Sequence, residues 1–215
     1  MLSCCGAAAH PWDQYEVEKR WRPPTVRCLI VGENPGALTS EYFYAVPKNY
    51  ASDRVIVRRC LLRGLYHERL IHEATLDAFR DAGFLFDHGI RCPLSREEVK
   101  REQRAAKSYR SRCVGCASHL VPLLSQSSIV WVMGHIASNA VANATEISTA
   151  EFPKEQRLIS KAPYPCELAP GSRFFLSEYL TRWTQPYAQG ICEAFGRFAQ
   201  SRGLSCLTLG IPPSS

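Results

Sequence analysis

The sequence lacks any long run of apolar residues. Its longest runs, such as residues 128–133, are far shorter than the roughly 20 residues that a membrane-spanning helix needs, so we expect no membrane partner. Residues 1–10 hold neither a basic leader nor a long apolar stretch, which argues against a secretory signal. We therefore expect an intracellular location, cytoplasmic or nucleoid-associated. Internal repeats and low-complexity segments are also lacking, which excludes repeat and fibrous architectures.

A regular cysteine spacing is missing as well. The ten cysteines of this 215-residue chain indicate reduced intracellular thiols, because a chain of this length can form a core without disulfides. The length fits a single domain, 1–215, in which residues 1–22 form an arm that docks through its aromatic side chains. We expect a monomer. The net charge of +6 favours a polyanionic partner.

Short apolar runs alternate with amphipathic segments along the chain. Strands are predicted at residues 26–31, 84–86, 129–133 and 204–209, and helices at 54–65, 68–82, 116–124, 136–144, 174–183 and 187–201. Ser95 and Glu98 form a capping-box pattern that predicts one further helix, which is strongly basic. The alternation predicts an α/β fold: a three-layer α/β/α sandwich with a central, mostly parallel four-stranded sheet. Ligands of such sheets bind at the carboxyl ends of the strands.

A polar turn follows the first predicted strand. Its sequence, Gly32-Glu33-Asn34-Pro35-Gly36, lacks the third glycine of a dinucleotide-binding loop and the Gly-Lys pair of a phosphate-binding loop. The turn places a carboxylate beside a carboxamide at the end of a strand, and such a pair can orient and activate a water. The simpler interpretation is an ordinary turn with a solvated Glu33.

Further segments follow this turn in a recognisable order. They are the aromatic residues 42–44, residues 86–93, residues 116–120 followed by 129–137, and residues 162–175. Together with the turn, they resemble the motifs of the uracil-DNA glycosylase superfamily over about residues 25–185. The resemblance implies a DNA glycosylase that flips out and excises a deaminated base, uracil by default, in base excision repair. The chain departs from the pattern at Tyr164, where many branches have a histidine, and at Asp87, where an asparagine is usual.

The resemblance assigns the chemistry to the turn and the base pocket to the residues around it. Glu33 and Asn34 would position the attacking water, and Glu33 would also stabilise the cationic sugar. Phe43, or a tyrosine beside it, would stack on the base. Burial is expected to raise the pKa of Asp87 until its protonated carboxyl can donate to uracil. A charged Asp87 would instead select a base with two adjacent donors, or a backbone amide would contact O4. If Asp87 does not face the base, His88 becomes the reader. The residues that would surround the flipped base are Gly32, Tyr42, Phe43, Asp87 and His88.

Contacts to DNA are expected from a loop and from the basic helix. The loop after residue 162 would fill the gap left by the flipped nucleotide. Residues 91–112 hold eight Arg or Lys against three Glu, which is typical either of a phosphate-tracking surface or of a solvated helix face. Four arginines at positions 54, 58, 59 and 63 form a second basic cluster. The residues expected at the DNA are Tyr164, Pro165, Ser172, Arg173, Arg101 and Arg104.

Two alternatives concern a cofactor and the activity. One glycosylase branch holds an iron–sulfur cluster, and Cys4, Cys5, Cys92 and Cys116 partly resemble its ligands, but the adjacency of Cys4 and Cys5 makes joint ligation awkward. We therefore expect no cofactor and ordinary buried thiols. The alternative function is a nucleic-acid-binding member of the superfamily that captures a base or abasic site with little or no hydrolysis. A third is an enzyme that hydrolyses small nucleotides.

Overall fold

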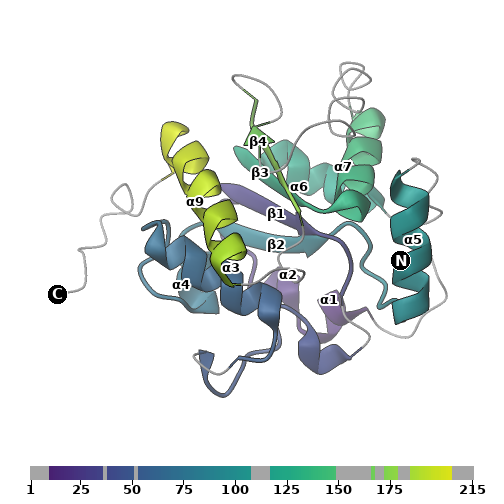
Figure 1. Cartoon of the computed structure of the whole chain (residues 1–215), viewed down its shortest axis with the longest axis horizontal. Helices are drawn as coiled ribbons and strands as arrows, with labels where there is room; N and C mark the ends of the chain where they lie inside the picture. The colour runs from purple at the N-terminus through teal and green to yellow at the C-terminus, as the bar shows by residue number, and fades with distance from the viewer. Residues whose placement is uncertain are drawn as a thin grey trace.

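A five-stranded sheet of order β2-β1-β3-β5-β4 lies at the centre of the fold (Figure 1). The structure is a computed structural model that describes residues 10–35, 38–50, 53–107, 117–148, 166–167, 172–178 and 185–204. The first four strands in this order are parallel, and the short β4 pairs antiparallel with β5 at the edge. This arrangement confirms the predicted α/β fold. The strand bounds are Cys28–Gly32 (β1), Phe84–His88 (β2), Ile129–Met133 (β3), Cys166–Glu167 (β4) and Phe174–Ser177 (β5).

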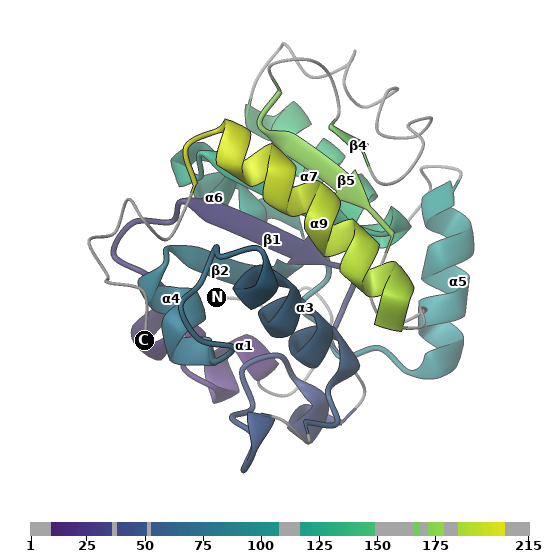
Figure 2. The same ribbon diagram turned by 60° about the vertical axis from the view of Figure 1, so that its left-hand side comes forward.

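Helices cover both faces of the sheet (Figures 1 and 2). On one face lie α3 (Ile56–His67), α4 (Leu76–Asp81) and α9 (Gln185–Ser201), and on the other lie α6 (Val121–Gln126) and α7 (His135–Ser148). The basic helix α5 (Arg96–Lys107) packs against α7. Two helices of a single turn, α1 (Pro11–Gln14) and α2 (Val17–Arg20), precede β1, and the 3-10 turn η1 (Thr39–Glu41) follows it.

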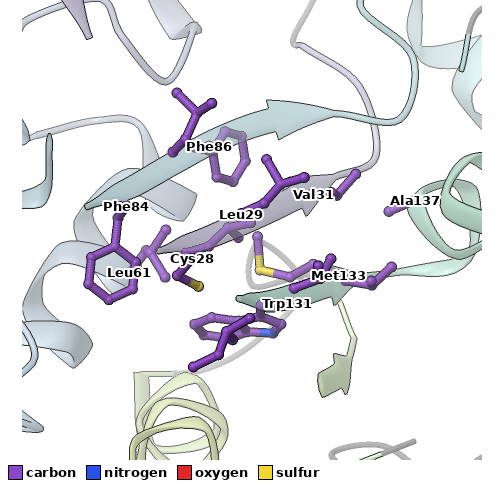
Figure 3. Packing of buried hydrophobic residues seen from close by; sticks show 14 of the residues in the cluster. Cys28, Leu29, Val31, Leu61, Phe84, Phe86, Trp131, Met133 and Ala137 are labelled. Atoms are coloured by element: carbon purple, nitrogen blue, oxygen red, sulfur yellow. The ribbon is translucent and has the colours of Figure 1, made fainter. Parts of the chain in front are cut away.

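Apolar side chains on both faces of the sheet pack against these helices (Figure 3). Every residue of β1, β2, β3 and β5 is buried, as expected for parallel strands that are covered on both sides. Trp131 of β3 stacks on Phe195 of α9, with ring centroids 4.2 Å apart, and its indole donates to Ser177 Oγ at 2.8 Å. On the other face, Val31 of β1 lies near Ala137 of α7 (Figure 3). The strands are therefore packed on both faces up to the carboxyl edge of the sheet.

A tyrosine closes the outer edge of β2. Tyr44 Oη accepts a hydrogen bond from the Phe86 amide at 2.8 Å and donates to the Phe86 carbonyl at 3.0 Å. A neighbouring strand would otherwise pair with these two backbone groups. One phenol thus satisfies both polar groups of an edge residue, and it fixes the segment after β1 beside β2.

The segment before β1 packs against the same region. Trp12 and Trp21 are buried, and the Trp21 ring stacks on Tyr44 with centroids 5.8 Å apart. Tyr15 stacks on Tyr42 in the same way, at 5.4 Å. Residues 10–22 are therefore an integral part of this side of the molecule.

Two predicted helices are wrong. Residues 174–177 of the expected helix 174–183 form β5, and the expected helix 68–82 begins only at Leu76. Arg69, with a φ of +56°, ends the preceding helix, and the Thr75 side chain then caps α4 by accepting from Ala78 N at 3.3 Å. The predicted strand 204–209 lies outside the described residues except for Leu204. In the described part of the chain, each helix is too short or too polar to cross a membrane.

Candidate functional site

The carboxyl ends of three neighbouring strands meet at one edge of the sheet. Gly32 at the end of β1 stands opposite His88 at the end of β2. The pairing continues beyond the strands, because Gly89 N donates to Gly32 O at 2.8 Å and Ile90 N donates to Glu33 O at 3.0 Å. The polar turn predicted from the sequence is therefore held directly beside the loop that follows β2.

Glu33 and Asn34 both lie at this edge, as predicted. The Glu33 side chain is buried, with only 5% of its surface exposed, and it lies against the backbone of Gly134, the residue after β3. Gly134 has a φ of +89°, and its amide donates to Ser177 O at the end of β5. Asn34 is half-buried, and its side-chain amide donates to Pro35 O at 2.7 Å. A desolvated carboxylate thus stands between the ends of β1 and β3.

His88 is a second buried polar residue at this edge. Its side chain is 3% exposed, and its Nδ1 has no hydrogen-bond partner among the described residues. Burial lowers the pKa of His88 to about 3, so the imidazole is neutral at pH 7. The ring stacks on Tyr42 at 5.5 Å and meets the edge of Phe86 at 5.0 Å. A buried nitrogen without a partner is uncommon in folded proteins, so this position calls for an explanation.

The structure corrects the role predicted for Asp87. Its side chain is completely buried and forms a bidentate ion pair with Arg91, with Nη2–Oδ2 and Nε–Oδ1 distances of 2.7 and 3.1 Å. The His88 amide also donates to Asp87 Oδ1, and His119 Nε2 lies 3.6 Å from Oδ2. Burial by itself would raise the pKa of Asp87, but Arg91, His119 and the hydrogen bonds together lower it below the ordinary value. The expected protonation of Asp87 is therefore wrong, and its carboxylate is already paired.

The aromatic residues after the turn belong to the core. The Phe43 ring is 1% exposed and stacks on Phe86 with centroids 4.2 Å apart, so its predicted stacking on a flipped base is wrong. Tyr42 is also buried, between Tyr15 and His88. Of the aromatic residues expected to bind the base, Tyr42 is the one that contacts the candidate site.

The residues expected on the DNA-inserting loop lie at two different edges. Ser172 and Arg173 precede β5 and therefore lie at its amino end, opposite the edge that holds Glu33. Arg173 donates from Nη1 to Leu124 O and Ser127 O, at 2.8 and 2.9 Å, and joins β5 to the end of α6. Their assignment as phosphate contacts at the site is thus wrong. Tyr164 and Pro165 lie outside the described residues, as does the segment 179–184.

The basic helix stands near the site. In both views α5 lies on the side toward which β1 and β2 point (Figures 1 and 2). Arg101 and Arg104 on this helix are exposed. The capping box is confirmed, because Ser95 N donates to Glu98 Oε2 at 2.8 Å and Glu98 N donates to Ser95 Oγ at 3.3 Å.

The cysteines show no metal centre among the described residues. No group of three or more His, Cys, Asp or Glu side chains in these ranges could hold a metal ion. Cys92 is disulfide-bonded, so the expectation of reduced thiols is wrong at this position and its sulfur is not a free thiolate ligand. Cys4, Cys5 and Cys116 lie outside the described residues.

Sequence reasoning missed three side chains that shape this edge. Arg91 fixes the charge of Asp87, and Trp12 packs on the Arg91 guanidinium with its ring centre 3.7 Å from Cζ. His119 Nε2 donates to His88 O at 2.9 Å. The sequence does hold one signal for the ion pair, because Asp87 lies four positions before Arg91. That spacing indicates a contact in a helix, but a loop was expected here, so no contact was predicted.

The chain gives no match in comparisons with protein-family models, with curated proteins or with solved structures.

Proposed function

We propose that the protein is a DNA glycosylase that hydrolyses the N-glycosidic bond of a flipped, deaminated base, with uracil as the default substrate. The observation that supports this proposal is the buried carboxylate of Glu33 at the carboxyl end of central strand β1, against the backbone of Gly134. The motif order of the sequence favours the same activity. DNA would be the partner of an intracellular monomer in base excision repair.

The turn carries the hydrolysis in this proposal. As the bond between the base and C1′ breaks, its electron pair leaves with the base and positive charge develops on the sugar. The Glu33 carboxylate stabilises this cation, because its burial strengthens charge–charge interaction. The oxygen of a water then bonds to C1′, and the proton of this water passes to the Glu33 carboxylate, while the base leaves as an anion. The Asn34 amide nitrogen is engaged with Pro35 O, so its amide oxygen is the group that orients the water.

In this proposal His88, and not Asp87, forms the hydrogen bond to the edge of the base. Asp87 is charged and already paired with Arg91, whereas His88 is neutral and holds a buried Nδ1 that has no partner within the described ranges. A neutral imidazole can donate from one nitrogen or accept at it, depending on the tautomer. It therefore suits a base edge such as that of uracil, which presents both a carbonyl and an N–H group.

The alternative is capture of a base or abasic site with little hydrolysis. Two of the expected base contacts are unavailable, because Phe43 stacks on Phe86 and Asp87 pairs with Arg91. A pocket with fewer contacts to the base holds the reacting geometry less firmly. This observation favours slow turnover, and the experiment below separates the two functions.

The test uses labelled oligonucleotides that carry uracil, hypoxanthine or xanthine, in single and double strands, followed by alkali cleavage. We expect alkali-labile sites with the wild type and about 10²-fold slower release with Glu33→Gln, at nearly unchanged DNA affinity. Glu193→Gln on α9 removes a carboxylate outside the site and serves as the matched control. Tight binding without cleavage would establish the alternative. Neither binding nor cleavage would contradict both functions.

A further inference from the structure

A groove runs along the amino-terminal half of α3, outside the candidate site. It consists of two adjoining hollows of about 480 and 660 Å³ that share Lys48 and Asn49 on their walls. The smaller hollow lies between the loop that holds Lys48 and Asn49, helix α3 and the segment before α4. The larger lies between the same loop, η1 and the arm. We call the two hollows together the α3 groove.

The walls of the α3 groove carry a surplus of positive charge. Arg58, one of the four arginines in the second basic cluster of the sequence, is buried and paired with Asp53 at 2.5 Å, so it is structural. Lys48 and Arg54 are exposed and form no ion pair with any described residue. Outside the buried pair, four cations and two carboxylates line the groove: Lys48, Arg54, Arg59, Arg63, Glu41 and Glu73.

Each hollow also contains a half-buried tyrosine, Tyr50 in the smaller and Tyr15 in the larger. Two of the most exposed apolar side chains, Leu38 and Val46, line the larger hollow at 59% and 56% exposure. Cations along a channel with aromatic and apolar side chains at intervals are typical of surfaces that bind single-stranded nucleic acid. A base can reach a ring inside a hollow only when it is not paired in a duplex.

The groove connects to the candidate site through stacked rings. Tyr15 in the larger hollow stacks on Tyr42, and Tyr42 stacks on His88 at the end of β2. The larger hollow is therefore separated from the end of β2 by a single ring, that of Tyr42.

We propose that the α3 groove binds single-stranded DNA, its cations contacting phosphates and its two tyrosines stacking on unpaired bases. The inference rests on the proposed function for the identity of the strand as DNA, but binding in the groove requires no catalysis. It extends that function because it places the strand beside the flipped nucleotide in the α3 groove. This groove is separate from both the turn and α5.

The charge test measures the affinity for a labelled oligodeoxythymidine of about 15 nucleotides over a series of salt concentrations. For the double variant Lys48→Ala/Arg54→Ala, we expect weaker binding and a salt slope shallower by roughly 0.7 for each lost contact. Arg197→Ala removes an exposed charge from α9 outside the groove and should leave the slope unchanged.

The stacking test compares Tyr50→Leu with Tyr50→Phe. Both variants lose the hydrogen bond that the Tyr50 hydroxyl accepts from Leu76 N at 3.2 Å, but only Tyr50→Leu loses the ring. We expect about tenfold weaker binding of the oligonucleotide by Tyr50→Leu than by Tyr50→Phe.

Wild-type affinity in the charge variant, or equal affinities of the two Tyr50 variants, would contradict the proposed binding of single-stranded DNA in the α3 groove. Stronger binding of a duplex of the same length would do so as well. If the wild type excises the base but the groove variants bind the oligonucleotide normally, the proposed function stands and only the proposed binding in the groove is rejected. If the wild type excises no base but the groove variants bind the oligonucleotide more weakly, binding in the groove is supported and the glycosylase activity is contradicted.

Discussion

Replacing Gly134 by alanine tests whether Glu33 acts where the structure places it. The added Cβ would lie 2.6 Å from Glu33 Oε1 and 2.9 Å from its Cδ and Cγ, closer than real Cβ contacts allow. The Gly134 backbone is held by its hydrogen bond to Ser177 O, so the carboxylate has to move. We expect about 10²-fold slower base release, the scale for loss of one catalytic group. This factor corresponds to about 2.7 kcal/mol of transition-state stabilisation.

The backbone strain of this substitution has a matched control. Gly203 also has a positive φ, +74° against +89° at Gly134, but a Cβ there would meet nothing within 4 Å. Gly203 also lies far from Glu33 in the fold, because its carbonyl accepts from Arg27, the residue before β1. Each alanine should cost about 1–2 kcal/mol of stability for its left-handed backbone, or about 2–4 °C of melting temperature per kcal/mol.

The assay is single-turnover base release from a uracil oligonucleotide at 20 °C, with thermal unfolding followed by circular dichroism. We expect both alanine variants to melt a few degrees below the wild type and only Gly134→Ala to release the base slowly. Equal release rates in the two variants would refute the assignment of Glu33. A Gly134→Ala protein that melts like Gly203→Ala yet excises slowly would confirm it.

Four further outcomes follow from buried contacts and from α5. Tyr44→Phe should lower the free energy of unfolding by about 2–4 kcal/mol in urea titrations, because two buried backbone groups at the edge of β2 lose their partner. Arg58→Met should cost about 3–5 kcal/mol in the same assay, because the partner carboxylate stays buried without a counter-ion, and neutralising that carboxylate as well should restore part of the loss. The pKa of His88 is about 3 in the folded protein, below its ordinary value of 6.5, so the unfolded chain takes up the proton first. The free energy of unfolding should therefore fall as pH drops from about 6.5 toward 3, by at most about 1.4 kcal/mol per pH unit, and His88→Asn should flatten this slope. Arg101→Ala/Arg104→Ala should reduce the salt dependence of duplex DNA binding by roughly 0.9 for each phosphate contact; an unchanged slope would indicate a solvated helix face.

The strands with the clearest patterns could be predicted from the sequence, and the shortest could not. Residues 129–133 are wholly apolar and bounded by polar residues and glycine, and β3 has these bounds. Residues 174–177 are also largely apolar, but a run this short is compatible with a strand or with a helix. Pairing with β3 decides between them, and the hydrogen bond from Trp131 to Ser177 links side chains that are distant in sequence.

The candidate site was predictable where it depends on local sequence. A strand followed by Gly-Glu-Asn-Pro-Gly places Glu33 and Asn34 at a carboxyl edge whatever the rest of the chain does. The environment of Asp87 was not predictable, because it depends on how the loop after β2 turns back and on where two distant residues, Trp12 and His119, pack. Arg91 reaches back from the loop after β2, and Trp12 packs on it from the arm.

The pleat of β2 explains why two adjacent polar residues at its carboxyl end have different environments. Successive side chains of a strand point to opposite faces, so Asp87 and His88 meet different neighbours although they are adjacent. Asp87 meets Arg91, which keeps it charged, whereas His88 meets Tyr42 in an apolar setting that keeps it neutral. An asparagine at position 87 would leave the Arg91 guanidinium without its anion beneath Trp12. Asp87 therefore comes with its own counter-ion, and in the proposed glycosylase the neutral donor or acceptor is His88, the next residue.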